Sequence, residues 1–352
     1  MKTNKFLIGF LLQAVVCSGG LHAQTDLHAN AYSIIQDAVT DIVCTSPTDA
    51  IQKEKRVIQI LDGKGKGDAS FVCMCDRFSS LKKFSGEVRD ASGNVIRKIK
   101  KSELKVTEYS DELVSDDYYY FFEYTPSRYP ITITYEWEIK NSDGLIGYPS
   151  FLPQKNYNQS VAQASYRILT PADNPCRYRT INMQAEVSQQ QTADGNWLTE
   201  VKVQSLPAIQ KEPYSPALSE LLPRIYFTPR NFSFEGTKGS MDNWQTYGAW
   251  QYQLLNGRDQ IPPALKEELQ RRTANCNTPY EKIAAVYQYL ASTTRYVSIQ
   301  LGIGGLQPIA ATDVHRTGFG DCKGLSNYMR AMLTELGIPS TYTVISTTNR
   351  RL

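Results

Sequence analysis

The chain has 352 residues, of which 41% are hydrophobic and 21% are charged. This composition is ordinary for globular proteins and argues against intrinsic disorder. The formal net charge is +3, and Lys and Arg are scattered among Asp and Glu, which argues against nucleic acid as the main partner. A chain of this length predicts about two domains, at ~150 residues each.

The first 23 residues have the pattern of a signal peptide for export. Two lysines precede an apolar run from Phe6 to Val16, and small and polar residues follow up to Ala23. The run is too short to span a bilayer. Cys17 follows a valine instead of a small residue, so we expect cleavage near Ala23 and no lipid anchor. The mature protein is therefore predicted to be periplasmic or extracellular, without a stable membrane span.

Residues 24–206 are predicted to form an antiparallel β-sandwich. Apolar and polar residues alternate here, and turn signals separate the alternating segments. The segment 129–139 (YPITITYEWEI) is the clearest strand, and 87–99 (EVRDASGNVIRKI) reads as a hairpin. The aromatic run 116–124 (DDYYYFFEY) could offer a carbohydrate surface, but we prefer to interpret it as one strand that fills the sandwich core.

Six cysteines remain of the seven once Cys17 is removed with the signal peptide. Cys73 and Cys75, in the segment FVCMC, would lie on one face of a strand, which makes a bond between them awkward. A soft-metal site is the alternative, but no histidine is nearby, and two buried cysteines are the preferred interpretation. Export permits disulfides without requiring them in a chain of this size.

The C-terminal part of the chain changes from strand spacing to helix spacing. Prolines and polar stretches mark residues 207–262 as a connecting region, and residues 263–352 are predicted to be α+β, beginning with helices. The best-specified helix is 276–292 (CNTPYEKIAAVYQYLAS), because it has a capping box and a proline at its first position. Its cap residues are Thr278, Pro279 and Glu281, and its predicted buried face is Ile283, Val286, Tyr287 and Leu290.

A second helix is predicted to begin at Cys322 and to stop at Gly337. Short strands are expected on either side, at 295–300 (RYVSIQ) and 341–346 (TYTVIS). The loop between the first strand and the helix contains GIGG, which lacks the spacing and the lysine of a phosphate-binding loop and is interpreted as a turn at the rim of the site. The apolar stripe of the helix is Leu325, Tyr328, Met329, Met332, Leu333 and Leu336.

Cys322 lies where a glycine-rich turn meets this helix, and the position suits a nucleophile. The unpaired N–H groups and the dipole of a helix N-terminus favour a thiolate over a thiol. Asp321 fits the cap position, although its charge opposes a thiolate, so the helix end and Lys323 would have to outweigh it. Gly318 and Gly320 let a substrate approach the backbone, and the Cys322 amide could face an oxyanion. The alternative is a buried cysteine that only starts a core-facing helix.

The run from Tyr296 to Ser346, which includes HRTGFGDCKGLSNYMRAMLTELGIPS, closely resembles the start of the core of bacterial transglutaminase-like proteins. In that family a Gly-Asp-Cys-Lys segment opens the helix of the nucleophile. The upstream part, from KRVIQILDGKGKGD to YPITITYEWEI, is similar to the domain of unknown function that commonly precedes this core in exported proteins of Bacteroides-type bacteria. The resemblance implies a papain-like site in which Cys322 attacks an amide and forms a thioester, which passes its acyl group to water or an amine.

The sequence departs from the family at the catalytic base. The family's histidine and its orienting aspartate lie on strands that follow the cysteine helix, but the printed sequence has no histidine after Cys322. His22 falls in the signal peptide, His28 is expected to be exposed, and His315 has no counterpart among the family's catalytic residues. The core is therefore expected to be incomplete at its C-terminus, with a longer gene product supplying the histidine and the aspartate.

The resemblance implies a cysteine amidohydrolase, acyltransferase or protease that acts on protein or peptide substrates. It implies no metal and no organic cofactor, and the chain as printed is expected to be inactive. Gln307 or Tyr296 could complete an oxyanion hole, and the sequence does not choose between them. The alternative function is a non-catalytic binding or scaffolding protein of the envelope that keeps the outline of the fold.

Overall fold

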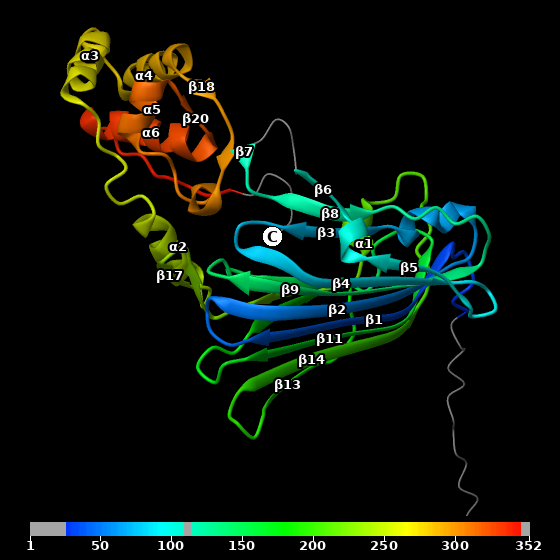
Figure 1. Cartoon of the computed structure of the whole chain (residues 1–352). Helices are drawn as coiled ribbons and strands as arrows, with labels where there is room; N and C mark the ends of the chain where they lie inside the picture. The colour runs from blue at the N-terminus through cyan, green and yellow to red at the C-terminus, as the bar shows by residue number, and fades with distance from the viewer. Residues whose placement is uncertain (1–25, 109–113, 346–352) are drawn as a thin grey trace, which may run out of the picture.

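The structure, a computed structural model, describes residues 26–108 and 114–345. The predicted signal peptide and the last residues of the predicted C-terminal domain lie outside these ranges. Figure 1 shows a broad β-sheet region and a separate cluster of helices, with helix α2 (Trp244–Gln253) between them. Nowhere in the described ranges is there a helix with the length and apolarity needed to cross a bilayer.

One large sheet forms the base of the β-region. From edge to edge its strands are β13 (Val187–Gln191), β14 (Trp197–Leu206), β11 (Gln159–Thr170), β1 (Ser33–Cys44), β2 (Asp49–Ile60), β9 (Ile131–Ser142), β4 (Ser79–Arg89) and β5 (Val95–Lys100). Neighbouring strands are antiparallel except β1 and β11, which run parallel. The predicted hairpin is β4–β5, and Gly93 in its turn has a positive φ of 85°.

Two three-stranded sheets cover one face of this base. The first is β3 (Phe71–Cys75), β8 (Tyr118–Phe122) and β6 (Lys105–Glu108), and the second is β10 (Tyr148–Phe151), β15 (Arg224–Thr228) and β12 (Arg177–Ile181). Ile35 of β1 and Ile58 of β2 are register partners, so their side chains point to the same side. Because Ile35 packs in the core under the second small sheet and Ile58 in the core under the first, both sheets lie on that side.

The opposite face of the base exposes charged side chains, among them Glu136, Lys140 and Arg167. The predicted β-sandwich is therefore confirmed, in the form of one base and two smaller covering sheets. The aromatic run is β8, which packs into the core, and Cys73 and Cys75 of β3 are 5% and 1% exposed. These two preferred interpretations are confirmed as well.

Residues 207–262 pack on both neighbours and add a small core of their own. Their elements are α1 (Leu218–Leu221), β15, β16 (Asn231–Phe234), β17 (Thr237–Ser240) and α2. The hairpin β16–β17 lies against α2, where the rings of Phe232 and Trp250 meet edge to face at 4.8 Å between centroids. The Trp250 ring nitrogen donates to the Thr237 hydroxyl at 3.0 Å, which satisfies the polar atom of this buried side chain.

The C-terminal elements form a compact helical core. They are α3 (Pro263–Thr273), α4 (Pro279–Thr293), β18 (Arg295–Tyr296), β19 (Ile299–Gln300), η3 (Gly302–Gly305), α5 (Ala311–Thr317), β20 (Phe319–Gly320) and α6 (Cys322–Glu335). Helices α3 to α6 share one apolar cluster, which includes Leu269, Val314 and Met332. The cluster holds α6 along one side and leaves its N-terminus at the surface.

Helix α4 confirms the predicted cap and corrects the predicted face. The Thr278 hydroxyl accepts from the Glu281 amide at 3.2 Å, and the Glu281 carboxylate accepts from the Thr278 amide at 3.1 Å. Tyr287, however, is 63% exposed and Ile283 is 36% exposed, because α4 turns a neighbouring stripe toward α3 and α6. The buried residues of that stripe are Val286, Tyr289 and Leu290.

Two predicted strands differ from the structure. Residues 295–300 are divided into β18 and β19, which pair in parallel with β20 and with β7 (Val114–Ser115) respectively. The described part of 341–346 has no regular secondary structure, so the predicted strand is wrong there. Its physical reason is that no described strand lies alongside these residues to pair with their backbone groups.

Candidate functional site

Cys322 is the first residue of α6, and its side chain is exposed. The alternative of a buried, core-facing cysteine is therefore wrong. Burial raises the pKa of the Cys44 thiol to about 12 and also raises the pKa of Cys176. Cys322 is the one exposed thiol among the described cysteines; the others are Cys44, Cys73, Cys75 and Cys176, which are buried, and Cys276, which is partly buried.

Asp321 caps α6 as predicted. Its Oδ1 accepts from the Gly324 amide at 2.9 Å, and the side chain is only 2% exposed. The ammonium group of Lys323 forms an ion pair with Oδ2 of the same carboxylate. Lys323 is therefore bound to the capping carboxylate and offsets its negative charge.

The two glycines before Cys322 fix the turn that leads to it. Gly318 ends α5 with a φ of 71°, a left-handed conformation that favours glycine. Gly320 lies opposite Tyr296 in the β18–β20 pair, and its carbonyl accepts from the Val297 amide at 3.0 Å. Tyr296, which is 62% exposed, thus lies on the strand beside the cysteine turn. The Gln307 side chain has no hydrogen bond to Cys322 in the described structure.

His315 lies on α5, whereas the sequence indicated a loop. Its Nδ1 is 3.0 Å from the hydroxyl oxygen of Tyr328 on α6. Burial raises the pKa of Tyr328 well above its usual value, so the hydroxyl stays protonated. This contact joins α5 to α6, and among the described residues no hydrogen bond joins His315 to Cys322.

Tyr342 is a neighbour of the cysteine that the sequence did not indicate. Burial raises its pKa, and the negative charges of Cys322 and Asp321 raise it further. Tyr342 thus interacts electrostatically with the residues at the start of α6. Tyr342 falls in the segment predicted as a strand, and no local sequence signal connects it to Cys322.

The GIGG segment forms η3 and connects the helical core to the β-region. The Gly302 amide donates to Asp116 at 3.1 Å, and the Ile303 amide donates to Glu235. Arg77 lies between the two carboxylates, 3.3 Å from Glu235 and 3.8 Å from Asp116. Carboxylates of the protein therefore occupy the amides that a phosphate would need, which supports the interpretation of GIGG as a structural turn. Beyond η3, Ile309 packs beside Gly324 in the first turn of α6.

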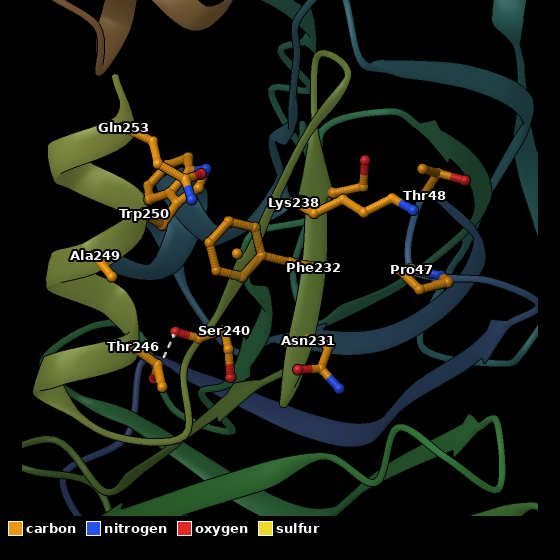
Figure 2. Close-up of a pocket in the computed structure, with 12 residues that line it drawn as sticks. Pro47, Thr48, Asn231, Phe232, Lys238, Ser240, Thr246, Ala249, Trp250 and Gln253 are labelled. Atoms are coloured by element: carbon orange, nitrogen blue, oxygen red, sulfur yellow. Dashed lines mark hydrogen bonds between the residues drawn. The ribbon is translucent and has the colours of Figure 1, made fainter. Parts of the chain in front are cut away.

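A hollow of about 620 Å³ lies between α2, the β16–β17 hairpin and the β1–β2 turn. Figure 2 shows Phe232 at its centre, with Trp250 on one side and Lys238 reaching toward Thr48 on the other. Phe232 and Trp250 are each only 2% exposed. Their rings are thus part of the local core and offer no free face for stacking a ligand.

A larger groove runs from the second small sheet past α2 to the segment after α6. It measures about 1070 Å³, and we call it the aromatic groove. A smaller hollow of about 290 Å³ adjoins it, since Trp244, Tyr247 and Val344 line both, and Tyr342 lines the smaller one. The groove is defined by Arg177, Tyr178, Arg179, Tyr226, Trp244 and Val344.

No cluster of three or more His, Cys, Asp or Glu side chains in the described ranges is arranged to hold a metal ion. Cys73 and Cys75 are neighbours, and a hydrogen bond between them raises the pKa of Cys73 and lowers that of Cys75. Both lie on β3, beside β8 in the first small sheet, where they fill the core.

Family comparison assigns the two parts of the chain. Residues 50–210 match the family model of a domain of unknown function, DUF3857, and residues 267–350 match that of the transglutaminase-like superfamily. The chain joins a DUF3857 domain to a transglutaminase-like core. The resemblance noted in the sequence is confirmed for both parts and for their order. Cys322 and α6 lie within the transglutaminase-like core, and the large sheet lies mainly within DUF3857.

Solved structures agree at the level of the fold. The chain is similar to a candidate protease from Parabacteroides distasonis, with 14% identity and a TM-score of 0.63, over 88% of this chain and 59% of that one. The chain thus spans less than two thirds of that protein.

Two other solved structures have TM-scores of 0.28, too low to support an argument. One is an M1 zinc metallopeptidase from Deinococcus radiodurans, with 8% identity, over 69% of this chain and 53% of that one. The other is a candidate nutrient-binding protein from Legionella pneumophila, with 9% identity, over 76% and 82%. Comparison with curated proteins finds no match.

Proposed function

We propose that this protein is an exported cysteine enzyme that hydrolyses or transfers acyl groups at amide bonds of protein or peptide substrates, with Cys322 as the nucleophile. The observation that carries the proposal is an exposed thiol at the first residue of α6, within the transglutaminase-like core. The buried cysteines of the β-region lack this access. The likeness to the Parabacteroides protein, which is described as a candidate protease, is consistent with peptide substrates.

The geometry of the helix start suits acyl transfer. The first amides of a helix have no partner within the helix. Asp321 takes the Gly324 amide and leaves the amides nearer to Cys322 for a ligand. When the sulfur attacks an amide carbon, these N–H groups can donate to the oxygen that becomes negative. The amine then leaves with a proton, and water or a second amine resolves the thioester.

The reaction also needs a general base, and no described residue is placed to act as one. His315 is bound to Tyr328, and Lys323 is paired with Asp321. Tyr342 has a raised pKa, so at neutral pH it keeps its proton and can donate a hydrogen bond without accepting the thiol proton. We therefore place the base, as part of the same proposal, outside the described residues.

The activity is tested with the full-length gene product. The assays measure ammonia release from glutamine-containing peptides, incorporation of a fluorescent amine and peptide cleavage. Cys322→Ala should lower the rate by ~10³-fold or more, because it removes the nucleophile. Cys276→Ala is the matched control and should retain the wild-type rate. A Cys322→Ala protein that keeps its activity would rule out the assignment.

Export is a separate part of the proposal and rests on residues 1–23. Cell fractionation followed by N-terminal sequencing should find the protein outside the cytoplasm and its first residue just after Ala23. Replacing Leu11 and Leu12 by Glu should retain the protein in the cytoplasm, because export requires an apolar run. Cytoplasmic protein with an intact N-terminus in the wild type would contradict export without affecting the role of Cys322.

A further inference from the structure

The aromatic groove runs from the second small sheet past α2 to the segment after α6, and the proposed chemistry does not use it. Its floor comes from β12 and β15, where Arg177 pairs with Thr228 and Arg179 pairs with Tyr226. Register partners of antiparallel strands point to the same side, so these four side chains form one continuous surface. The volume of about 1070 Å³ is large enough for several side chains of a ligand.

The groove carries positive charge that no carboxylate in the described structure neutralises. The Arg179 side chain is exposed and makes no hydrogen bond or ion pair with another described residue. Arg177 donates to two backbone carbonyls, including that of Asp242 at 2.6 Å, and to no carboxylate. Asp242 also lines the groove, but its carboxylate is paired with Arg230 at 2.8 Å. A guanidinium group without a partner favours a carboxylate of the ligand.

The same surface also exposes large aromatic side chains. Trp244 is 77% exposed and Tyr226 is 36% exposed. A cluster of exposed aromatic and arginine side chains is typical of protein recognition surfaces, where these residue types provide most of the binding energy. The groove therefore suits a ligand that has both apolar and acidic side chains.

The backbone around the groove suits an extended ligand. Val344 and Ile345, which lie in a segment without regular secondary structure, already line the groove. Strand β12 ends its sheet, so its outer edge has no strand partner in the described structure. An extended peptide could pair with such an edge. At the other end, the adjoining hollow reaches Tyr342, which interacts electrostatically with Cys322.

We propose that the aromatic groove binds an extended, acidic peptide segment and thereby selects the acyl donor. Carboxylates of the peptide meet Arg179 and Arg177, and its apolar side chains lie on Trp244 and Tyr226. The bound segment places the residue that follows it beside Cys322. Only this last step rests on the proposed function, since peptide binding requires no reaction.

Binding is measured with the full chain carrying Cys322→Ala, so that no turnover occurs. The probe is a fluorescein-labelled peptide of about ten residues, which spans roughly 33 Å when extended, in which Glu alternates with Leu. A second probe has Lys in place of Glu. Fluorescence anisotropy should show that the acidic probe binds at least roughly tenfold more tightly than the basic one, and that added salt weakens its binding.

Variants of the groove locate the binding site. Arg179→Glu should lower the affinity for the acidic probe by roughly tenfold or more. It should raise the affinity for the basic probe, since the charge of the side chain is reversed. Trp244→Ala should weaken the acidic probe by a similar factor without reversing the preference for charge. The control is Arg128→Glu, which changes another exposed arginine outside the groove and should leave both affinities unchanged.

Three outcomes with the peptide probes would overturn the proposal. These are no binding of the acidic probe, equal affinity for the two probes, or an affinity that Arg179→Glu leaves unchanged. A single-stranded oligonucleotide that binds more tightly than the acidic probe, and loses affinity with Arg179→Glu, would assign the groove to another polyanion and would likewise refute it. If the acidic probe binds as expected but Cys322→Ala retains activity, peptide binding by the groove is supported and the role of Cys322 as nucleophile is refuted.

Discussion

The β-region and the helical core place their cysteines in opposite surroundings. In the β-region Cys44 and Cys176 lie in a packed layer between two sheets, and burial raises the pKa of both thiols. In the helical core Cys322 lies at the free end of α6, while the middle of that helix is buried. The same side chain thus fills space in one region and is open to a substrate in the other. Whether a cysteine lies inside a packed core or at a surface helix end decides which role it can have.

The sharpest test of this contrast is alkylation. In native protein at pH 8, iodoacetamide should modify Cys322 ~10³-fold or more faster than Cys44, because a buried thiol reacts only after the structure opens. A pKa of about 12 also keeps Cys44 a thiol up to about pH 9. Peptide mapping by mass spectrometry measures each rate. In denatured protein all cysteines should react. If Cys44 reacts as fast as Cys322 in native protein, the two cysteines do not differ in accessibility and the contrast is refuted.

The second test compares a buried tyrosine of the β-region with an exposed tyrosine of the helical core. Tyr135 of β9 is 2% exposed and its hydroxyl donates to the Ala69 carbonyl at 2.7 Å, above η1 (Gly63–Ala69). Tyr135→Ala should lower the free energy of unfolding by about 3–5 kcal/mol, since it leaves a cavity and an unpaired carbonyl. Tyr287→Ala, on the exposed side of α4, should change it by less than about 0.5 kcal/mol. Urea denaturation followed by circular dichroism measures both, and similar losses would show that Tyr287 is part of a core.

The cap of α6 tests how the nucleophile helix is held. Asp321→Ala should reduce stability by about 1 kcal/mol, because the Gly324 amide loses its acceptor. Asp321→Asn keeps an acceptor oxygen and should lose less. Urea denaturation of the two variants separates the hydrogen bond from the charge. If Asn destabilises as much as Ala, the ion pair with Lys323 is the main contribution and the assigned cap is not.

The smallest expected effect concerns pH and the β1–β2 turn. The Thr48 hydroxyl, 2.6 Å from the carboxylate, is the main cause that lowers the pKa of Asp49, and Ser46 contributes. A carboxylate whose pKa is lower in the folded state stabilises the folded protein at pH values above its unfolded-state pKa of about 3.9. This stabilisation is lost as the pH falls through the folded-state pKa. Thr48→Val should therefore cost under about 1 kcal/mol at pH 6 and less at about pH 2. Urea denaturation at both values checks this, and an equal loss at both would exclude the linkage.

Local signals in the sequence predicted what local contacts determine. Alternation located β9, and the Thr278 cap located the start of α4, since both depend on residues a few positions apart. Asp321 and Cys322 were predicted at the start of α6 for the same reason.

Contacts between distant segments were missed. Examples are the parallel pairing of β1 with β11, the pairing of β19 with β7, and the approach of Tyr342 to Cys322. The aromatic groove was not predicted either, because β12, α2 and the segment after α6 meet only in the folded chain.

The anchoring of η3 has a consequence for how such proteins can be recombined. A Cβ atom at Gly302 would lie 2.6 Å from an Arg77 nitrogen and 2.7 Å from a Glu235 oxygen, so a larger residue would displace the ends of these two side chains. Two amides of η3 find their acceptors on Asp116 and Glu235, outside the transglutaminase-like match. A recombination that transferred the helical core alone would leave both amides without these acceptors. We therefore expect the helical core and the β-region to be inherited together.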